Sequence, residues 1–175
     1  MVGDINNDGV ADLIRLDSSG GAATVLARLG NGDGTLSAEV SYNTGLVAAA
    51  DALLGDYTGD GQLDVLVAAP GAGTLRLIQG NGDGTFKASV FVASGALNST
   101  ISLTQADLNR DGSLDIVQYS SAGMSVLMGN QGIVLKGDGT FKAAATVNEF
   151  SPGGRTVVVD IDDDGNLDLI SAIAN

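Results

Sequence analysis

The sequence predicts an all-β fold built from a repeated four-stranded antiparallel unit. A nine-residue acidic motif occurs four times, with its first aspartate at positions 4, 56, 107 and 160, so the chain repeats every 51 to 53 residues. Each motif is followed by a short apolar run rich in β-branched residues, and Gly/Ser turns separate the runs. No window of useful length has a helical period with caps. This period is that of β-propeller blades, and the 175 residues hold about 3.4 repeats of roughly 52 residues.

Each repeat is expected to contain four strands in a fixed order. The first leads into the acidic motif, at 48–54, 100–106 and 155–159. The second follows the motif, at 13–16, 65–68, 116–119 and 169–172. The third alternates apolar and polar residues, at 74–78 and 124–128. The fourth is expected at 38–42, 88–92 and 143–147. We therefore expect one domain, divided into a partial blade 1–47, blades 48–97 and 98–153, and a partial blade 154–175.

The acidic motif has the pattern of a calcium loop. It places oxygen side chains at its first, third, fifth and ninth positions and a glycine at the sixth, where the chain must reverse. Calcium takes six to eight oxygen ligands at about 2.3–2.6 Å. The seventh residue would add its backbone carbonyl. The expected ligands are Asp4, Asn6, Asp8, Val10 and Asp12; Asp56, Thr58, Asp60, Gln62 and Asp64; Asp107, Asn109, Asp111, Ser113 and Asp115; and Asp160, Asp162, Asp164, Asn166 and Asp168.

These loops account for the net charge of the chain, which is −13. Their side-chain ligand positions hold 13 of the 21 acidic residues, and the other 8 match the 8 Lys and Arg. An acidic protein without a basic patch is a poor candidate for binding nucleic acid or an anionic membrane.

Composition excludes several other classes of site. The chain has no Cys and no His, so it has no disulfide, no thiolate zinc site and no Ser/His or Cys/His pair for nucleophilic catalysis. The closely spaced carboxylates lie mainly inside the metal loops, so we expect no enzyme. No cationic segment leads into a long apolar run, so we expect neither a signal peptide nor a membrane span in this chain.

A second motif recurs between the metal loops, at 30–36, 80–86 and 137–141. Its Asn-Gly-Asp-Gly sequence favours a tight hairpin turn, because these residues tolerate positive φ. We favour plain turns over additional ion sites. The third copy is interrupted by residues 131–136, which are either a contact ridge or a lengthened hairpin.

The four Asp-x-(Asp/Asn/Thr)-x-Asp-Gly-x-x-Asp motifs, the segment 65–71 and the Gly-Asn-Gly-Asp-Gly-Thr-Phe turns closely resemble the FG-GAP/VCBS repeat family, which forms the calcium-binding blades of integrin α-subunit-type β-propellers. The resemblance covers essentially the whole chain. It implies up to four Ca²⁺ ions, in loops that join the innermost strand of a blade to the second. It also implies an extracellular or cell-surface location. Thr58 departs from the usual Asp or Asn, so its site is expected to be weaker.

An EF-hand would need a bidentate Glu at the twelfth loop position and flanking helices. The residues at that position are Arg15, Val67, Gln118 and Ser171, all inside β-rich runs. The EF-hand alternative therefore fails.

The sequence favours a calcium-stabilised structural or interaction module used for adhesion or self-assembly. The alternatives are a carbohydrate-binding propeller lectin and a fragment of a larger cell-surface propeller. Sugar sites usually use aromatic platforms, and the chain has no Trp, 3 Tyr and 4 Phe. A protein or glycan ligand would bind the face opposite the metal loops, at loops such as 42–45, 97–99 and 148–155, where Glu149, Phe150 and Arg155 are the best candidates.

We expect the first and fourth repeats to mediate self-association. The chain begins without most of an innermost strand and its fourth repeat holds two strands, whereas propellers close with about four to eight blades. Exposed strand edges invite pairing with another chain. We expect association through Arg155–Val159 and Leu167–Ile173, giving a closed ring or an open filament.

Overall fold

The computed structural model describes residues 1–69, 74–94, 100–120, 123–131, 137–142, 145–147 and 156–171. Throughout this part of the chain every regular element is a β-strand. The strands form three four-stranded and two two-stranded sheets. All described pairings are antiparallel, which confirms the predicted all-β fold. The same described residues contain no helix that is long and apolar enough to cross a membrane.

The first two repeats each form one sheet in which neighbouring strands follow each other in the chain. The first sheet contains β1 (Val2–Gly3), β2 (Asp12–Asp17), β3 (Thr24–Arg28) and β4 (Val40–Asn43). The second contains β5 (Asp51–Gly55), β6 (Asp64–Ala68), β7 (Thr74–Ile78) and β8 (Val90–Ser94). Consecutive strands can pair in this way because tight turns connect them.

The third repeat forms the same sheet with one added hairpin. Its sheet contains β9 (Thr100–Ala106), β10 (Asp115–Ser120), β11 (Gly123–Leu127) and β14 (Ala145–Val147). The added pair is β12 (Gly129–Gln131) with β13 (Gly137–Phe141), which flank the insertion. The pairing of β12 with β13 favours the lengthened hairpin over the contact ridge, although residues 132–136 lie outside the described part. The fourth repeat contributes β15 (Thr156–Val159) and β16 (Asp168–Ser171).

Two of the fourth strands start later than expected. β4 begins at residue 40 and β8 at residue 90, two residues after the expected starts at 38 and 88. The cause is a backbone hydrogen bond that closes each preceding turn. Ser37 N–H donates to the Leu29 carbonyl at 2.7 Å, and Lys87 N–H donates to the Gln79 carbonyl at 2.8 Å. The strands begin beyond this closure.

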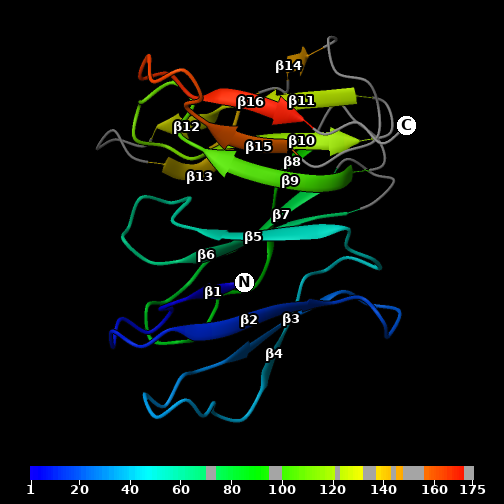
Figure 1. Ribbon diagram of the computed structural model, residues 1–175. Coiled ribbons are helices and arrows are strands. Elements are labelled where there is room, and N and C mark those ends of the chain that lie inside the picture. Colours follow the sequence, from blue (N-terminus) through cyan, green and yellow to red (C-terminus); the bar gives the residue numbers. More distant parts are fainter. Residues whose placement is uncertain are drawn as a thin grey trace.

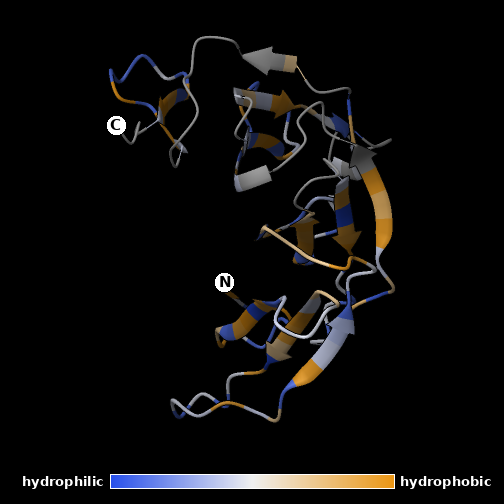
Figure 2. Ribbon diagram, turned by 90° about the vertical axis from the view of Figure 1, so that its right-hand side faces the viewer, coloured by the Kyte–Doolittle hydropathy of each residue, from blue (hydrophilic) through white to orange (hydrophobic). Residues whose placement is uncertain are grey.

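The sheets stack in chain order and do not close on themselves. Figure 1 shows the first sheet at one end, β5–β8 next to it, and β9–β11 with β15–β16 at the other end. In the view turned by 90°, the sheets follow an open arc (Figure 2). Each acidic motif lies between the first and second strand of its sheet. The fold is thus an open β-propeller-type array.

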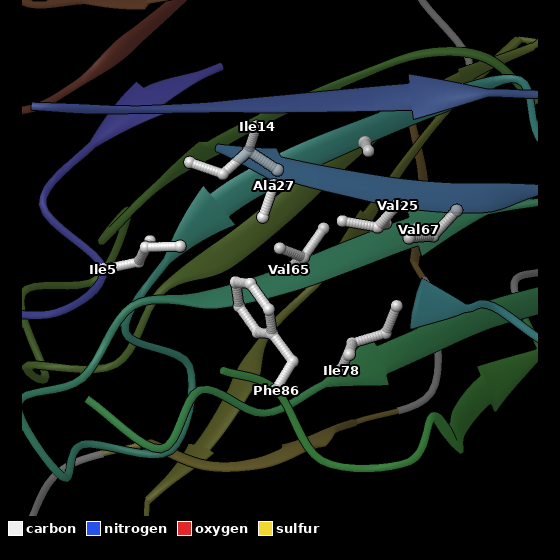
Figure 3. Packing of buried hydrophobic residues seen from close by; sticks show 9 residues of the cluster. Ile5, Ile14, Val25, Ala27, Val65, Val67, Ile78 and Phe86 are labelled. Carbon is white, nitrogen blue, oxygen red and sulfur yellow. The ribbon is translucent and has the colours of Figure 1, made fainter. Parts of the chain in front are cut away.

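Apolar residues fill the spaces between successive sheets. One cluster joins the first and second repeats, and Figure 3 shows Ile14 and Val25 pointing toward Val65 and Ile78. A second cluster joins the second and third repeats, and a third joins β10–β11 to β15–β16. Full burial of one such aliphatic side chain contributes about 1.5–3 kcal/mol. Packing between repeats therefore holds the acidic loops in place.

Candidate metal-binding loops

The four acidic loops have the same backbone conformation. The fourth residue is left-handed in each, with φ of 59° at Asn7, 69° at Gly59, 58° at Arg110 and 57° at Asp163. The sixth residue is a glycine with φ of 82°, 85°, 86° and 86° in chain order. A positive φ is costly for most side chains, and Gly, Asn and Asp adopt it most easily. The loops are therefore four copies of one geometry.

The first aspartate of each loop is held inside the turn by backbone N–H groups. One oxygen accepts from the glycine N–H, at 2.8, 2.9, 2.8 and 2.8 Å in chain order. In the first three loops the other oxygen also accepts from the N–H of the fifth residue, at 3.2, 3.2 and 3.0 Å. The Gly9 N–H is the main reason why the pKa of Asp4 lies below its usual value. These bonds orient the four carboxylates within their turns.

The ninth aspartate fastens the loop to the following hairpin. In the first three loops, one oxygen accepts from the second loop residue at 2.8, 3.0 and 2.8 Å. The other accepts from the glycine that opens the hairpin, at 2.8, 2.9 and 2.8 Å. Asp12, Asp64 and Asp115 are buried. Burial raises the pKa of Asp64 to about 6 and also raises that of Asp115. Sequence reasoning treated this residue only as a ligand and missed its fastening role.

The fifth aspartate orients the seventh residue, whose carbonyl was the predicted ligand. Its carboxylate accepts from the N–H of Val10, Gln62, Ser113 and Asn166 at 2.7, 2.8, 2.9 and 2.7 Å, respectively. The third residue accepts from the N–H of the fifth in the first, third and fourth loops, at 3.2, 3.0 and 3.2 Å. Thr58 differs, because its Oγ1 is buried and has no partner among the described residues.

The fourth loop brings three carboxylates together. Oxygen atoms of Asp160, Asp162 and Asp168 all lie within 4.8 Å of one another. Two ligands that each lie about 2.4 Å from one ion are at most about 4.8 Å apart. The second oxygen of Asp160, Oδ1, is buried and has no hydrogen-bond partner among the described residues. This all-oxygen set therefore fits a hard cation such as Ca²⁺ or Mg²⁺.

The Asn-Gly-Asp-Gly hairpins have the contacts of plain turns. Asp33 accepts from the N–H and the hydroxyl of Thr35 at 2.9 and 2.6 Å, and Asp83 accepts from Thr85 at 2.9 and 2.5 Å. These bonds hold the pKa of both aspartates below the usual value. In the third copy Asn130 still donates to Thr140, at 3.0 Å, despite the insertion. The carboxylates of Asp33 and Asp83 thus accept hydrogen bonds from within their own turns, as expected of plain hairpin turns.

The face opposite the loops is described only in part. Residues 97–99 and 148–155, with the candidates Glu149, Phe150 and Arg155, lie outside the described residues. Thr44 is buried, and its hydroxyl donates to the Ala23 carbonyl at 2.7 Å, which is a structural role. A groove of about 380 Å³ lies between β4 and the segment 86–89. Its aromatic wall is the edge-to-face pair Tyr42 and Phe86, with ring centroids 5.1 Å apart.

Comparisons with known proteins agree with this repeat structure. A family model described as FG-GAP-like repeat matches residues 4–67 and 56–117. A solved structure of an Agrocybe aegerita lectin, titled as specific recognition of non-reducing terminal N-acetylglucosamine, is similar with a TM-score of 0.69 and 24% identity. The match covers 97% of this chain and 45% of the lectin chain, so this chain spans less than half of that protein. No curated protein sequence matches this chain.

Proposed function

Because the chain belongs to the FG-GAP-like repeat family, we propose that it is an extracellular or cell-surface interaction module whose four acidic loops bind calcium. Extracellular calcium modules bind with Kd of about 10⁻⁴–10⁻³ M. Loops with this calcium affinity are filled at the millimolar calcium concentration found outside cells. The proposed role is adhesion or assembly. It includes no catalysis, because the closely spaced carboxylates are those of the loops.

The observation that carries this proposal is the carboxylate group of the fourth loop. Asp160, Asp162 and Asp168 lie close enough together to share one ion. Like charges at this range repel each other, and a divalent cation removes the repulsion. When bound, calcium would supply positive charge and accept the loop oxygens as ligands. Asp160 and Asp168 are already oriented by the Gly165 and Ile161 N–H groups, at 2.8 and 3.0 Å, so little ordering remains to be done on binding.

Isothermal titration with CaCl₂ tests the proposal through a matched pair of variants. Asp162→Asn removes a predicted ligand charge, whereas Asp163→Asn removes the same charge from the left-handed fourth position. Asn tolerates a positive φ, so the control keeps the backbone at Asp163, where φ is 57°. We expect Asp162→Asn to weaken the tightest site at least tenfold and Asp163→Asn to weaken it about twofold or less. Equal effects of the two variants, or no calcium binding by the wild type, would contradict the proposal.

A second candidate function is carbohydrate binding at the groove beside β4. The groove combines the Tyr42 ring with the Asn43 amide and the Lys87 ammonium, and sugar sites use such mixtures of an aromatic face with a few polar groups. The lectin that shares the fold is described as recognising N-acetylglucosamine. A glycan array followed by NMR titration with that sugar tests this function. Shifts centred on Tyr42 that disappear in Tyr42→Ala would support it, and an empty array at millimolar calcium would exclude it.

Self-association through the outer repeats is the third part of the proposal. The described residues of β15 and β16 carry exposed apolar side chains, among them Val157 and Ile170. Exposed apolar clusters of this kind mark interaction surfaces. Light scattering at millimolar calcium tests this part, because a monomer at high protein concentration would exclude it.

A further inference from the structure

Two contacts define how one repeat packs on the next. The first is a backbone hydrogen bond from a hairpin glycine to the carbonyl of the second loop residue in the preceding repeat. It joins Gly84 to Ile5 at 3.0 Å and Gly139 to Tyr57 at 2.9 Å. The bond is therefore present both between the first and second repeats and between the second and third repeats.

The second contact is the packing of a leucine against a glycine. A Cβ added at Gly3 would lie 2.8 Å from the Leu63 side chain, and one at Gly55 would lie 2.7 Å from the Leu114 side chain. Leu63 and Leu114 are the eighth residues of their loops. The glycine leaves room for the leucine of the following repeat, and a larger residue would collide with it.

The outward face of the fourth repeat lacks this cover. Ile161 is 67% exposed, whereas its counterparts Ile5 and Tyr57 are 3% and 2% exposed. Ile170 is 41% exposed, whereas its counterpart Leu66 is fully buried, at 0%. In the first two repeats these positions are covered by the next repeat. The fourth repeat therefore exposes an apolar face that corresponds to the buried faces of the first two repeats. This face lies at the end of the array that contains β15 and β16 (Figure 1).

One substitution on this face restricts which repeat can cover it. Val159 pairs with Asp168 in the register in which Gly3 pairs with Asp12 and Gly55 with Asp64. A leucine arriving as Leu63 and Leu114 do would meet the Val159 side chain. Among the four loops, only the first has a small eighth residue, Ala11, and the others have leucine. The larger Val159 of the fourth repeat thus fits the smaller Ala11 of the first repeat.

The first repeat also carries the donor that the face requires. Gly34 occupies the hairpin position of Gly84 and Gly139, and its φ of 87° matches their values of 84° and 78°. In a second copy, its N–H would meet the Ile161 carbonyl as the Gly84 N–H meets that of Ile5. Arg28 stands where the second repeat has Ile78, since Leu13 pairs with Arg28 as Val65 pairs with Ile78. The loop from Asp160 to Asp168 has five carboxylates, so Arg28 of a second copy would bring a positive charge toward an acidic loop.

We propose that the first repeat of a second copy packs on the fourth repeat, with Ala11 against Val159 and Gly34 N–H donating to the Ile161 carbonyl. This inference rests on the self-association part of the proposed function and names the surfaces that join. Two copies contain about the number of residues of the solved lectin, of which this chain covers 45%. We therefore expect a closed pair in which each copy uses both faces once.

A compensating pair of substitutions tests the contact. Ala11→Leu adds the leucine that Val159 excludes, and Ala11 is exposed, so the folded chain itself tolerates the change. Val159→Gly restores the glycine and leucine pair of the first two junctions, whereas the third repeat has Ala106 at this position. By analytical ultracentrifugation in millimolar CaCl₂, we expect a wild-type dimer, at least tenfold weaker association of Ala11→Leu, and recovery of the dimer in the double variant. Ala48→Leu, at another exposed alanine, is the control and should leave the dimer intact.

The outcomes separate this inference from the proposed function. A wild-type monomer would overturn both the pairing and self-association, whereas calcium binding is measured independently by titration. A dimer that persists in Ala11→Leu, or a double variant that folds without recovering the dimer, would overturn the pairing alone. If circular dichroism shows that the double variant is unfolded, Ile161→Ser decides the matter. It must weaken association at least tenfold, and unchanged association would overturn the inference.

Discussion

The hydrogen bond between Tyr57 and Gln105 joins the second and third repeats, so removing it tests how much this contact stabilises the array. The Tyr57 hydroxyl donates to Oε1 of Gln105 in the third repeat, and Gln105 Nε2 donates to the Leu54 carbonyl at 2.9 Å. Burial raises the pKa of Tyr57, so the hydroxyl remains a donor at neutral pH. The side chain is buried in the cluster shared by the second and third repeats.

Tyr57→Phe keeps the ring and removes the hydroxyl, so Gln105 Oε1 loses its donor in a partly buried position. Leaving such a group unpaired costs about 1–3 kcal/mol. With a urea m-value of about 1–3 kcal/mol/M, a loss of about 2 kcal/mol lowers the unfolding midpoint by roughly 1 M. We expect this shift in urea titrations followed by circular dichroism at constant, saturating calcium.

A double-mutant cycle with Gln105→Leu isolates the pair from the other contacts of Tyr57. Neighbouring residues that share a hydrogen bond show coupling energies of about 0.5–3 kcal/mol. We expect a coupling near 1–2 kcal/mol. Additivity within about 0.3 kcal/mol would refute the reasoning, because it would mean that the bond contributes nothing to the joining of these repeats.

Four further expectations follow from the loops and turns. Excess chelator should lower the melting temperature by many degrees, since four sites with Kd of about 10⁻⁴–10⁻³ M contribute about 2–6 kcal/mol at millimolar calcium; coincident melting curves would contradict this. The fourth loop should fill first and the second last, so Asp164→Ala should destabilise the calcium-loaded protein more than Thr58→Ala, and the reverse order in thermal melts would refute the ranking. The pKa of Asp33 is lower in the folded protein than in the unfolded chain. Its hydrogen bonds to Thr35 therefore stabilise the folded state above the unfolded pKa of about 3.9, and this stabilisation is lost as the pH falls through the folded pKa. A pKa measured by NMR at or above about 3.9 would exclude this. Gly80→Ala places a Cβ against a backbone carbonyl, whereas Gly20 has open space around it. Gly80→Ala should therefore cost about 2 kcal/mol or more in urea unfolding and Gly20→Ala less than about 0.5, and similar costs would contradict the packing.

Most strands could be predicted because their signals are local. The second strand of each repeat follows an acidic motif and consists of β-branched residues, so its position was predicted to within about one residue. The later starts of β4 and β8 depend on hydrogen bonds that close the preceding turns. Those bonds join residues eight apart, so the sequence next to the strand does not reveal them.

The loop conformation was also predictable in outline, because the sixth glycine is present in every copy. The fastening role of the ninth aspartate was not. It depends on strand pairing, which brings Gly30, 18 residues away, to 2.8 Å from Asp12. The Tyr57 and Gln105 pair, 48 residues apart, likewise has no counterpart in the other repeats that could have revealed it. Contacts between distant residues require the assembled fold.

The clusters between sheets differ in size, and this has a consequence for how the protein comes apart. Among the residues that the structure describes, nine buried ones join the first two repeats, eight join the second to the third, and three join the third to β15–β16. In an array where each unit touches only its neighbours, stability is a sum of nearest-neighbour terms. We expect the chain to fray from its carboxyl-terminal end while the first two repeats stay folded. The fourth repeat should therefore open first, and the urea midpoints of the Tyr57 and Gly80 variants describe the later unfolding of the inner repeats.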